Sequence, residues 1–133
     1  MALPLAAQGY KIAVAGLVHS HVWGHLGRMA KGDVAKLVGI AEPNAELVAE
    51  AKKQVGADVP FFDDYRKMLA EAKPDILWAF VENNRHLEIV EACAPRKIHM
   101  IHQKPLASSY SDALAIRALA RKHGVQVLTN FDI

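Results

Sequence analysis

The sequence predicts an α/β fold, a doubly wound parallel sheet of about six strands with helices on both faces. Short apolar runs rich in β-branched residues alternate along the chain with amphipathic segments of helical period. Residues that end helices, such as Gly56, Pro74 and Gly124, separate the two kinds of segment. Strands joined by helices in this way form right-handed crossovers, which place the strands parallel in one sheet.

Six segments have the composition of strands. The first, KIAVA, is apolar after its leading lysine and runs directly into Gly16. The expected strands are residues 11–15, 37–41, 60–62, 76–80, 98–101 and 125–129, of which the third is the weakest. Because a helical pattern follows each of the first five, the six strands are expected to belong to a single sheet.

The helices are predicted from their apolar stripes and from their end signals. One begins in the turn after Gly16, and the others are expected at residues 45–55, 64–72, 85–94 and 112–123. Asn44 and Asn84 can cap the helices that follow them, and Ser111 stands near the start of the last one. Two prolines, Pro74 and Pro95, follow the third and fourth of these helices and forbid their continuation.

The composition is that of a globular domain. The chain has 133 residues, of which 52% are apolar and 23% charged, and its formal net charge is +2. This charge is too small to favour a nucleic acid or a membrane surface, and no apolar run approaches the ~20 residues that span a bilayer. We therefore expect no nucleic-acid partner and no membrane partner. A single cysteine, Cys93, excludes an internal disulfide.

The first nine residues, MALPLAAQG, are expected to be a disordered end or a trimmed leader. Their small apolar residues also fit the tail of an export signal. The expected location is the cytoplasm. Export is the alternative if this segment is the remnant of a signal peptide. Residues 10–133 are expected to form one domain, because no linker or low-complexity stretch divides them.

The turn after the first strand is the candidate ligand site. In KIAVAGLVHSHVWGHL, an apolar strand runs into Gly16 and then into a helix. Turns of this kind approach a pyrophosphate with the backbone N–H groups of a helix N-terminus. Glu42 follows the second strand, where a carboxylate can accept hydrogen bonds from ribose hydroxyls. Val18 and His21 stand where a G-x-G-x-x-G turn has its second and third glycines.

Two later segments carry a family resemblance. VENNRH contains an N-x-x-H motif made of Asn83 and His86, and IHQKP ends in Lys104 and Pro105. From Tyr10 onward the chain resembles the N-terminal Rossmann domain of the Gfo/Idh/MocA family of NAD(P)-dependent oxidoreductases. Members of that family have a glycine-rich first turn, an acidic residue after the second strand, P-N-x-x-H after the fourth and E-K-P after the fifth. The resemblance covers nearly the whole chain.

The match to these motifs is partial. Besides Val18 and His21 in the first turn, Glu82 stands in place of the proline of P-N-x-x-H, and Gln103 in place of the glutamate of E-K-P. Gln103 can still form a hydrogen bond to a ribose, without the negative charge of a glutamate. A histidine at the position of His86 is expected to orient the loop after the fourth strand or to cap a helix.

The resemblance implies a role for each matching position. Lys104 would lie near the nicotinamide, bind a substrate hydroxyl and assist its proton transfer, and partial burial would bring its pKa nearer to neutrality. The residues expected to bind the cofactor are Gly16, Val18, His19, Ser20, His21, Glu42, Val81, Asn83, His86, Gln103, Lys104 and Pro105. The Glu42 carboxylate favours NAD over NADP, because it would repel a 2′-phosphate.

The histidines near the first turn raise the alternative of a metal site. His19, His21 and His25 crowd one turn, and the spacing of the last two places both imidazoles on one helix face. His102, at another strand end, could join them. No Asp, Glu or Cys nearby completes a familiar set of ligands, so we expect no metal at this turn.

Two functions are weighed. Family members carry a second, larger α/β domain that supplies most of the substrate pocket, and this chain stops at LTNFDI, where that domain would begin. The first function is that of the NAD-binding domain of a dehydrogenase, which transfers a hydride between nicotinamide and a sugar or polyol in the full-length protein. The alternative is a non-catalytic Rossmann-like module that has lost the dinucleotide and binds or self-associates, and a homo-oligomer is compatible with either.

Overall fold

The predicted α/β fold is confirmed. The computed structural model describes residues 9–32 and 35–131, and most of the expected leader, residues 1–9, lies outside this range. Six parallel strands form one sheet in the order β3-β2-β1-β4-β5-β6. They are β1 Tyr10–Ala15, β2 Ala35–Ala41, β3 Phe61–Phe62, β4 Ile76–Ala79, β5 His99–Gln103 and β6 Val127–Asn130.

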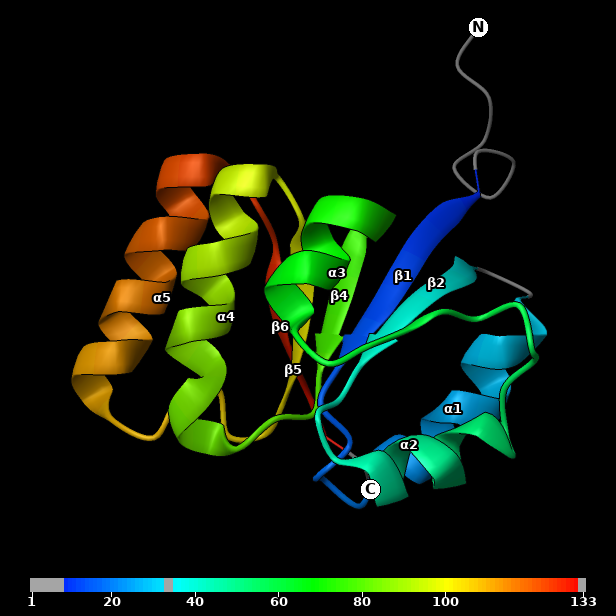
Figure 1. Cartoon of the computed structure of the whole chain (residues 1–133). Helices are drawn as coiled ribbons and strands as arrows, with labels where there is room; N and C mark the ends of the chain where they lie inside the picture. The colour runs from blue at the N-terminus through cyan, green and yellow to red at the C-terminus, as the bar shows by residue number, and fades with distance from the viewer. Residues whose placement is uncertain (1–8, 33–34, 132–133) are drawn as a thin grey trace, which may run out of the picture.

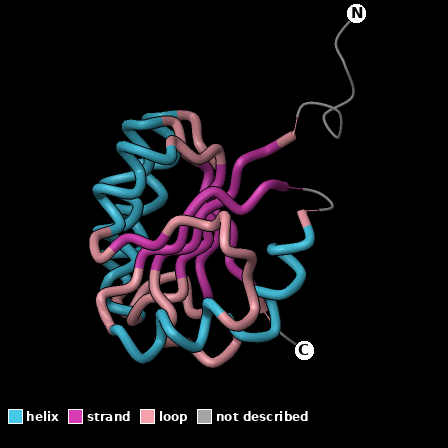
Figure 2. The backbone as a smooth tube through the Cα atoms, turned by 45° about the vertical axis from the view of Figure 1, so that its right-hand side comes forward, coloured by secondary structure: helices cyan, strands magenta, loops and turns pink. Residues whose placement is uncertain are grey.

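The helices cover the two faces of the sheet unequally. They are α1 Val22–Lys31, α2 Ala45–Lys52, α3 Tyr65–Ala72, α4 His86–Cys93 and α5 Tyr110–His123. Figure 1 shows α3, α4 and α5 on one face and α1 and α2 on the other, and the turned view of Figure 2 shows the same two groups on opposite sides of the strands. None of the helices formed by the described residues could span a bilayer.

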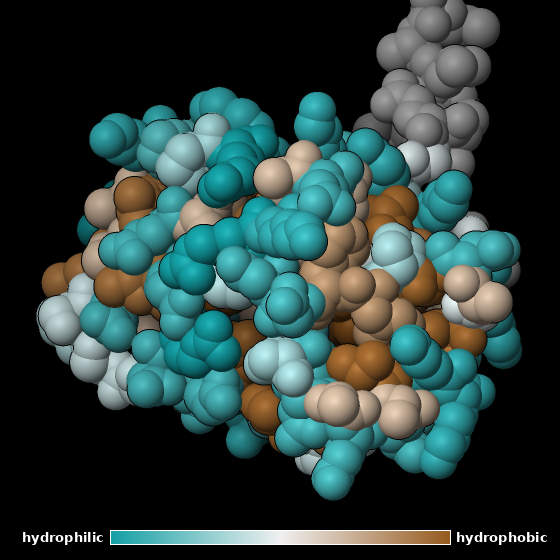
Figure 3. All heavy atoms as spheres, viewed as in Figure 1, coloured by the Kyte–Doolittle hydropathy of each residue, from teal (hydrophilic) through white to brown (hydrophobic). Residues whose placement is uncertain are grey.

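Strand β1 shows how the sequence builds two cores from one sheet. Successive side chains of a strand point to opposite faces. Ile12 and Val14 therefore pack with residues of α1 and α2, whereas Ala13 and Ala15 face α3, α4 and α5. All four are buried, so the strand has no solvated face. On the outer face seen in Figure 3, hydrophilic side chains predominate and hydrophobic ones show between them.

Several element boundaries differ from expectation. The second helix ends at Lys52 rather than at residue 55. A short 3-10 turn, η2 (Asn83–Arg85), precedes α4, so Asn84 does not cap that helix. The cap of α5 is Ser109 rather than Ser111, because Ser109 has an extended backbone from which its Oγ accepts the N–H of Asp112. Strand β5 continues to Gln103, since that residue pairs with β6.

The sheet order reverses beside β1, which lies between β2 and β4. Ligands in doubly wound folds bind at such a switch point, at the carboxyl ends of the strands. The first turn crosses this point through Gly16, which has a φ of 84°. A Cβ there would lie 2.7 Å from Val81 Cγ1 and 3.0 Å from the backbone carbonyl oxygen of Phe80. Only glycine fits both the left-handed backbone and the space.

Two histidines are buried together between α4 and β5. His86 is 1% exposed and His102 is fully buried, and their ring centroids lie 4.6 Å apart. Three of their ring nitrogens, His86 Nε2 and both of His102, have no hydrogen-bond partner within the described part of the chain. Burial lowers the pKa of His86, and burial together with the charge of His86 lowers the pKa of His102 to about 3. Both rings are therefore neutral in the folded protein near pH 7.

We predict that Gly16→Ala destabilises the domain by about 1–3 kcal/mol, because the new Cβ meets Val81 and Phe80 and the backbone stays left-handed. Gly24→Ala is the matched control: a Cβ at this helical position meets nothing within 4 Å. It should stabilise α1 by about 0.5–1 kcal/mol. Urea unfolding of the two variants measures both effects, and equal stabilities would contradict the account of the turn.

We also predict that the buried histidines make the fold sensitive to acid. Since their pKa values are lower in the folded than in the unfolded state, the unfolded state binds more protons as pH falls below about 6.5. Each group then removes stability with a slope of up to about 1.4 kcal/mol per pH unit. His102→Leu should flatten the decline of the unfolding free energy between pH 6.5 and 5. An unchanged slope in urea titrations across this range would refute the role of His102.

Candidate functional site

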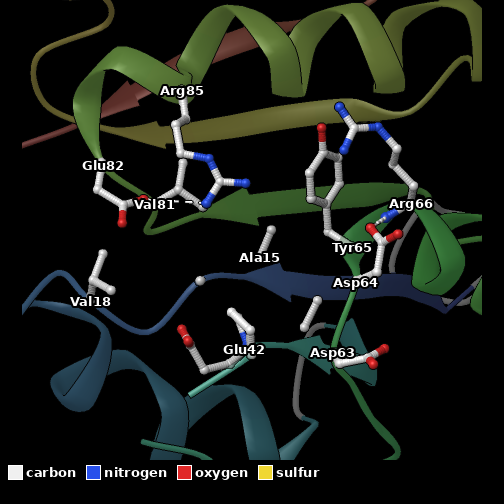
Figure 4. Close-up of a pocket in the computed structure, with 13 residues that line it drawn as sticks. Ala15, Val18, Glu42, Asp63, Asp64, Tyr65, Arg66, Val81, Glu82 and Arg85 are labelled. Atoms are coloured by element: carbon white, nitrogen blue, oxygen red, sulfur yellow. Dashed lines mark hydrogen bonds and ion pairs between the residues drawn. The ribbon is translucent and has the colours of Figure 1, made fainter.

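A cleft lies at the switch point, where the ends of β1, β2 and β4 meet. Its volume is about 210 Å³. Figure 4 shows Glu42 and Val18 on one side and Arg85, Tyr65 and Arg66 on the other. The lining residues are Ala15, Gly16, Val18, Ala41, Glu42, Pro43, Asp63, Asp64, Tyr65, Arg66, Val81, Glu82 and Arg85.

The first turn forms the floor of this cleft. Gly16 lies between the two strands that flank β1. Its N–H donates to Ala41 O of β2 at 2.8 Å, and it comes close to Phe80 and Val81, which follow β4. Further along the turn, His19 N–H donates to Phe80 O at 3.4 Å. Val18, 50% exposed, projects beside the cleft where a second glycine would leave room. A ligand at the floor would therefore meet backbone at Gly16 and a branched side chain at Val18.

Glu42 is a fixed acceptor at the end of β2. The residue is only 4% exposed. Its Oε2 accepts the N–H of Leu17 at 2.8 Å, and its Oε1 accepts the N–H of Asn44 at 2.9 Å. These bonds hold the carboxylate against the first turn. An ionised carboxylate has about four lone-pair sites, so it can accept ligand hydroxyls as well.

The opposite rim is a network of charged side chains centred on Glu88 of α4. Its carboxylate accepts from Tyr65 Oη at 2.9 Å, Arg66 Nη2 at 3.3 Å and Arg85 Nε at 2.8 Å. The hydrogen bond from Arg85 is the main reason that the pKa of Glu88 is below its usual range. Arg85 also reaches Glu82 at 3.3 Å. Both guanidinium groups at the cleft are therefore paired with carboxylates.

The expected cofactor residues fall into two groups. Gly16, Val18, Glu42 and Val81 line the cleft. The remaining residues lie outside it: His19, Ser20, His21, Asn83, His86, Gln103, Lys104 and Pro105. Most of these belong to the neighbouring ends of β4 and β5 and to the start of α1. The cleft and these strand ends together make an extended surface along the carboxyl edge of the sheet.

Lys104 follows β5 and is exposed, so the partial burial expected for its side chain is not found. Its backbone is held firmly, because Lys104 N–H donates to Asn130 O at 3.2 Å. The preceding side chain, Gln103, is fully buried and contacts both Asn130 Nδ2 and His21 Nδ1. Both ends of the Gln103 amide therefore contact other side chains of the protein.

His86 has a structural contact with the loop after β5. Its Nδ1 lies 3.0 Å from Leu106 O. Since a carbonyl only accepts, the ring carries its proton on Nδ1 and donates it. Leu106 is two residues past Lys104, so His86 orients the loop after β5. The backbone of Val81, in the loop after β4, also lies close enough to act on the pKa of His86.

Of the imidazoles considered as metal ligands, His19 and His21 lie together, with ring centroids 4.7 Å apart, but His25 and His102 do not join them. The side chain that reaches the first turn from β5 is Gln103, whereas His102 points to the other face and packs on His86. His25 instead packs on Trp78, with ring centroids 4.5 Å apart. Among residues 9–32 and 35–131, no group of three or more His, Cys, Asp or Glu side chains could hold a metal ion.

Sequence reasoning missed the rim opposite Glu42. Tyr65 and Arg66 follow β3, a strand of two residues that the pattern marked only weakly. Asp63 was missed as well, and it lies on the Glu42 side of the cleft (Figure 4). Arg85 lies within the N-x-x-H segment, between its two matched positions. Their positions in the sequence could have indicated them, because all of them follow the carboxyl end of β3 or β4 by at most six residues.

Comparison with known proteins places this geometry in a family. Residues 10–131 match the family model GFO_IDH_MocA, described as an oxidoreductase family with an NAD-binding Rossmann fold. The chain is 26% identical over 100 residues to myo-inositol 2-dehydrogenase of Thermotoga maritima, a match that covers 75% of this chain and 30% of the relative.

Solved structures agree with the fold. Scyllo-inositol dehydrogenase from Lactobacillus casei, solved with NAD(H) and scyllo-inositol, matches with a TM-score of 0.81 at 20% identity over 92% of this chain and 36% of that one. The WlbA dehydrogenase from Bordetella pertussis, solved with NADH and UDP-GlcNAcA, has a TM-score of 0.80 at 25% identity, over 92% and 37% of the two chains. The chain spans about a third of the length of these relatives.

The chain belongs to the Gfo/Idh/MocA oxidoreductase family, as its NAD-binding Rossmann domain.

Proposed function

We propose that this domain binds NAD, with the adenosine end in the cleft beside Glu42. The observation that carries the proposal is the Glu42 carboxylate, which two backbone N–H groups hold at the cleft floor as an acceptor for ribose hydroxyls. The second support is Gly16, whose lack of a side chain lets the first turn run close against Phe80 and Val81 at the base of the cleft. A cleft of about 210 Å³ is smaller than the roughly 300–1,000 Å³ of pockets that enclose a whole ligand, so it takes one end of the dinucleotide.

NAD is preferred over NADP because of the charges around that end. A 2′-phosphate is usually bound by an arginine. Here both arginines at the cleft, Arg66 and Arg85, are already bound by Glu88, and Arg85 also by Glu82. Glu42 and Asp63 add further negative charge to the lining. A phosphate would meet repulsion without a cation that is open to it.

The proposed reaction is the oxidation of a sugar or polyol hydroxyl in a protein that combines this domain with a substrate domain. The bound dinucleotide supplies a hydride acceptor. Lys104, exposed at the end of β5, is proposed to bind the substrate hydroxyl and assist the transfer of its proton. His86 supports this role, since it holds the loop that follows Lys104 through Leu106 O. Relatives with inositol and nucleotide-sugar ligands support the substrate class.

Calorimetric titration with NADH and NADPH, before and after metal chelation, tests the cofactor assignment. We expect NADH binding that survives chelation and weaker NADPH binding. Glu42→Gln should shift the affinity ratio toward NADPH by about tenfold, because it removes a repulsion on the order of 1–2 kcal/mol. Glu46→Gln, an exposed change in α2, should leave the ratio unchanged. If neither nucleotide binds, the alternative of a Rossmann module with another use replaces this proposal.

Lys104→Met tests the proposed catalytic side chain. In a protein that joins this domain to a substrate domain, polyol oxidation should slow by about 100-fold or more, as when a general acid–base group is lost. Affinity for NADH should change little, because the lysine acts on the substrate hydroxyl. Lys67→Met, an exposed change in α3, serves as the control. Unchanged turnover in Lys104→Met, measured by NADH formation, would exclude this role.

A further inference from the structure

Two residues that depart from the family motifs contact each other. His21 stands at the third glycine position of the first turn, and Gln103 stands at the glutamate position of E-K-P. They are 82 positions apart, yet Gln103 Nε2 lies within hydrogen-bond distance of His21 Nδ1. Each departure alone replaces a residue of the family's motifs. Together, His21 and Gln103 form a direct contact between the first turn and the end of β5.

The contact belongs to a larger network at the strand ends. The other end of the Gln103 amide, Oε1, accepts from Asn130 Nδ2 at 3.1 Å. Asn130 O in turn accepts the N–H of Lys104 at 3.2 Å. This orientation makes Gln103 Nε2 the donor and His21 Nδ1 the acceptor. One buried amide thus joins the start of α1, the end of β5 and the end of β6.

We propose that Gln103 is a positioning residue of the dinucleotide site, which ties the first turn to the strand end that carries Lys104. The inference rests on the proposed function, in which the first turn takes the phosphates and Lys104 lies at the nicotinamide end. Gln103 is fully buried, so its own contact with the cofactor is indirect. A buried amide that loses its partner pays the full cost of desolvation, which is why the link resists opening.

The His21 ring also packs on His19, with ring centroids 4.7 Å apart, so a double-mutant cycle rather than a single variant isolates its link to Gln103. His21 stands at the N-cap of α1, yet its side chain makes no capping hydrogen bond there. Its removal therefore takes away the link to Gln103 without removing a side-chain cap. Gln103→Leu removes the amide and places an apolar side chain of similar size in the buried position.

A double-mutant cycle on NADH binding measures the link. We expect His21→Ala and Gln103→Leu each to weaken NADH binding by about three- to tenfold, the loss of one hydrogen bond. The double variant should bind no more weakly than the weaker single variant, because the two changes remove the same bond. Effects that multiply in the double variant, or an affinity that Gln103→Leu leaves unchanged, would overturn the proposal.

Two further variants keep the test decisive. Gln126→Leu makes the same chemical change at an exposed residue before β6, at the opposite end of the strands, and should leave NADH affinity unchanged. Gln103→Asn keeps the amide but shortens its reach by one methylene, so it should weaken binding like Gln103→Leu even if the leucine variant does not fold. Full affinity in Gln103→Asn would also overturn the proposal.

The failure of the proposed function and the failure of this inference can be told apart. If the unaltered chain binds no NADH, the proposed function fails and the inference fails with it. If the unaltered chain binds NADH but the effects of the two substitutions are independent, only the inference is contradicted.

Discussion

The site depends on one close backbone approach, the passage of Gly16 between β2 and β4. Its N–H donates to Ala41 O on one side, and a Cβ on it would meet Phe80 and Val81 on the other. A side chain at this point would force the first turn away from the end of β4, at the place where the sheet order reverses. The floor of the cleft, the entry into α1 and the position of Glu42 beside Leu17 all follow from this passage.

In the proposed function, charge decides which dinucleotide the cleft accepts. The two guanidinium groups at its rim are bound by Glu88 and Glu82, and Glu42 is held against the first turn by two backbone N–H groups. In the proposed function, this pairing leaves acceptors for ribose hydroxyls and no arginine at the rim open to a 2′-phosphate. The same pairs join the start of α3 to the turn after β4, since Glu88 contacts both Arg66 and Arg85. The proposed preference for NAD and the fixed position of these segments therefore rest on one set of contacts.

The sequence predicted the sheet and most of the helices, because these depend on local pattern. It also singled out Gly16 and Glu42, which the structure brings to one cleft because both stand next to strand ends. It could not predict which side chain of β5 reaches the first turn. His102 and Gln103 are adjacent, so they point to opposite faces, and the exact end of β5 decides which faces α1. The expected strand ended at residue 101, whereas β5 continues to Gln103 through its pairing with Asn130. The link from Gln103 to His21 and the burial of His102 on His86 both follow from that register.

We propose the cleft at the ends of β1, β2 and β4 as the place where a dinucleotide binds. Amide chemical-shift mapping of the ¹⁵N-labelled chain during titration with NADH tests this proposal most directly. We expect large shifts at Gly16, Leu17 and Asn44, around the Glu42 carboxylate, and little change at Ala113 and Gly124, which line a separate groove between α5 and β6. Shifts confined to that groove, or none at the first turn, would contradict it.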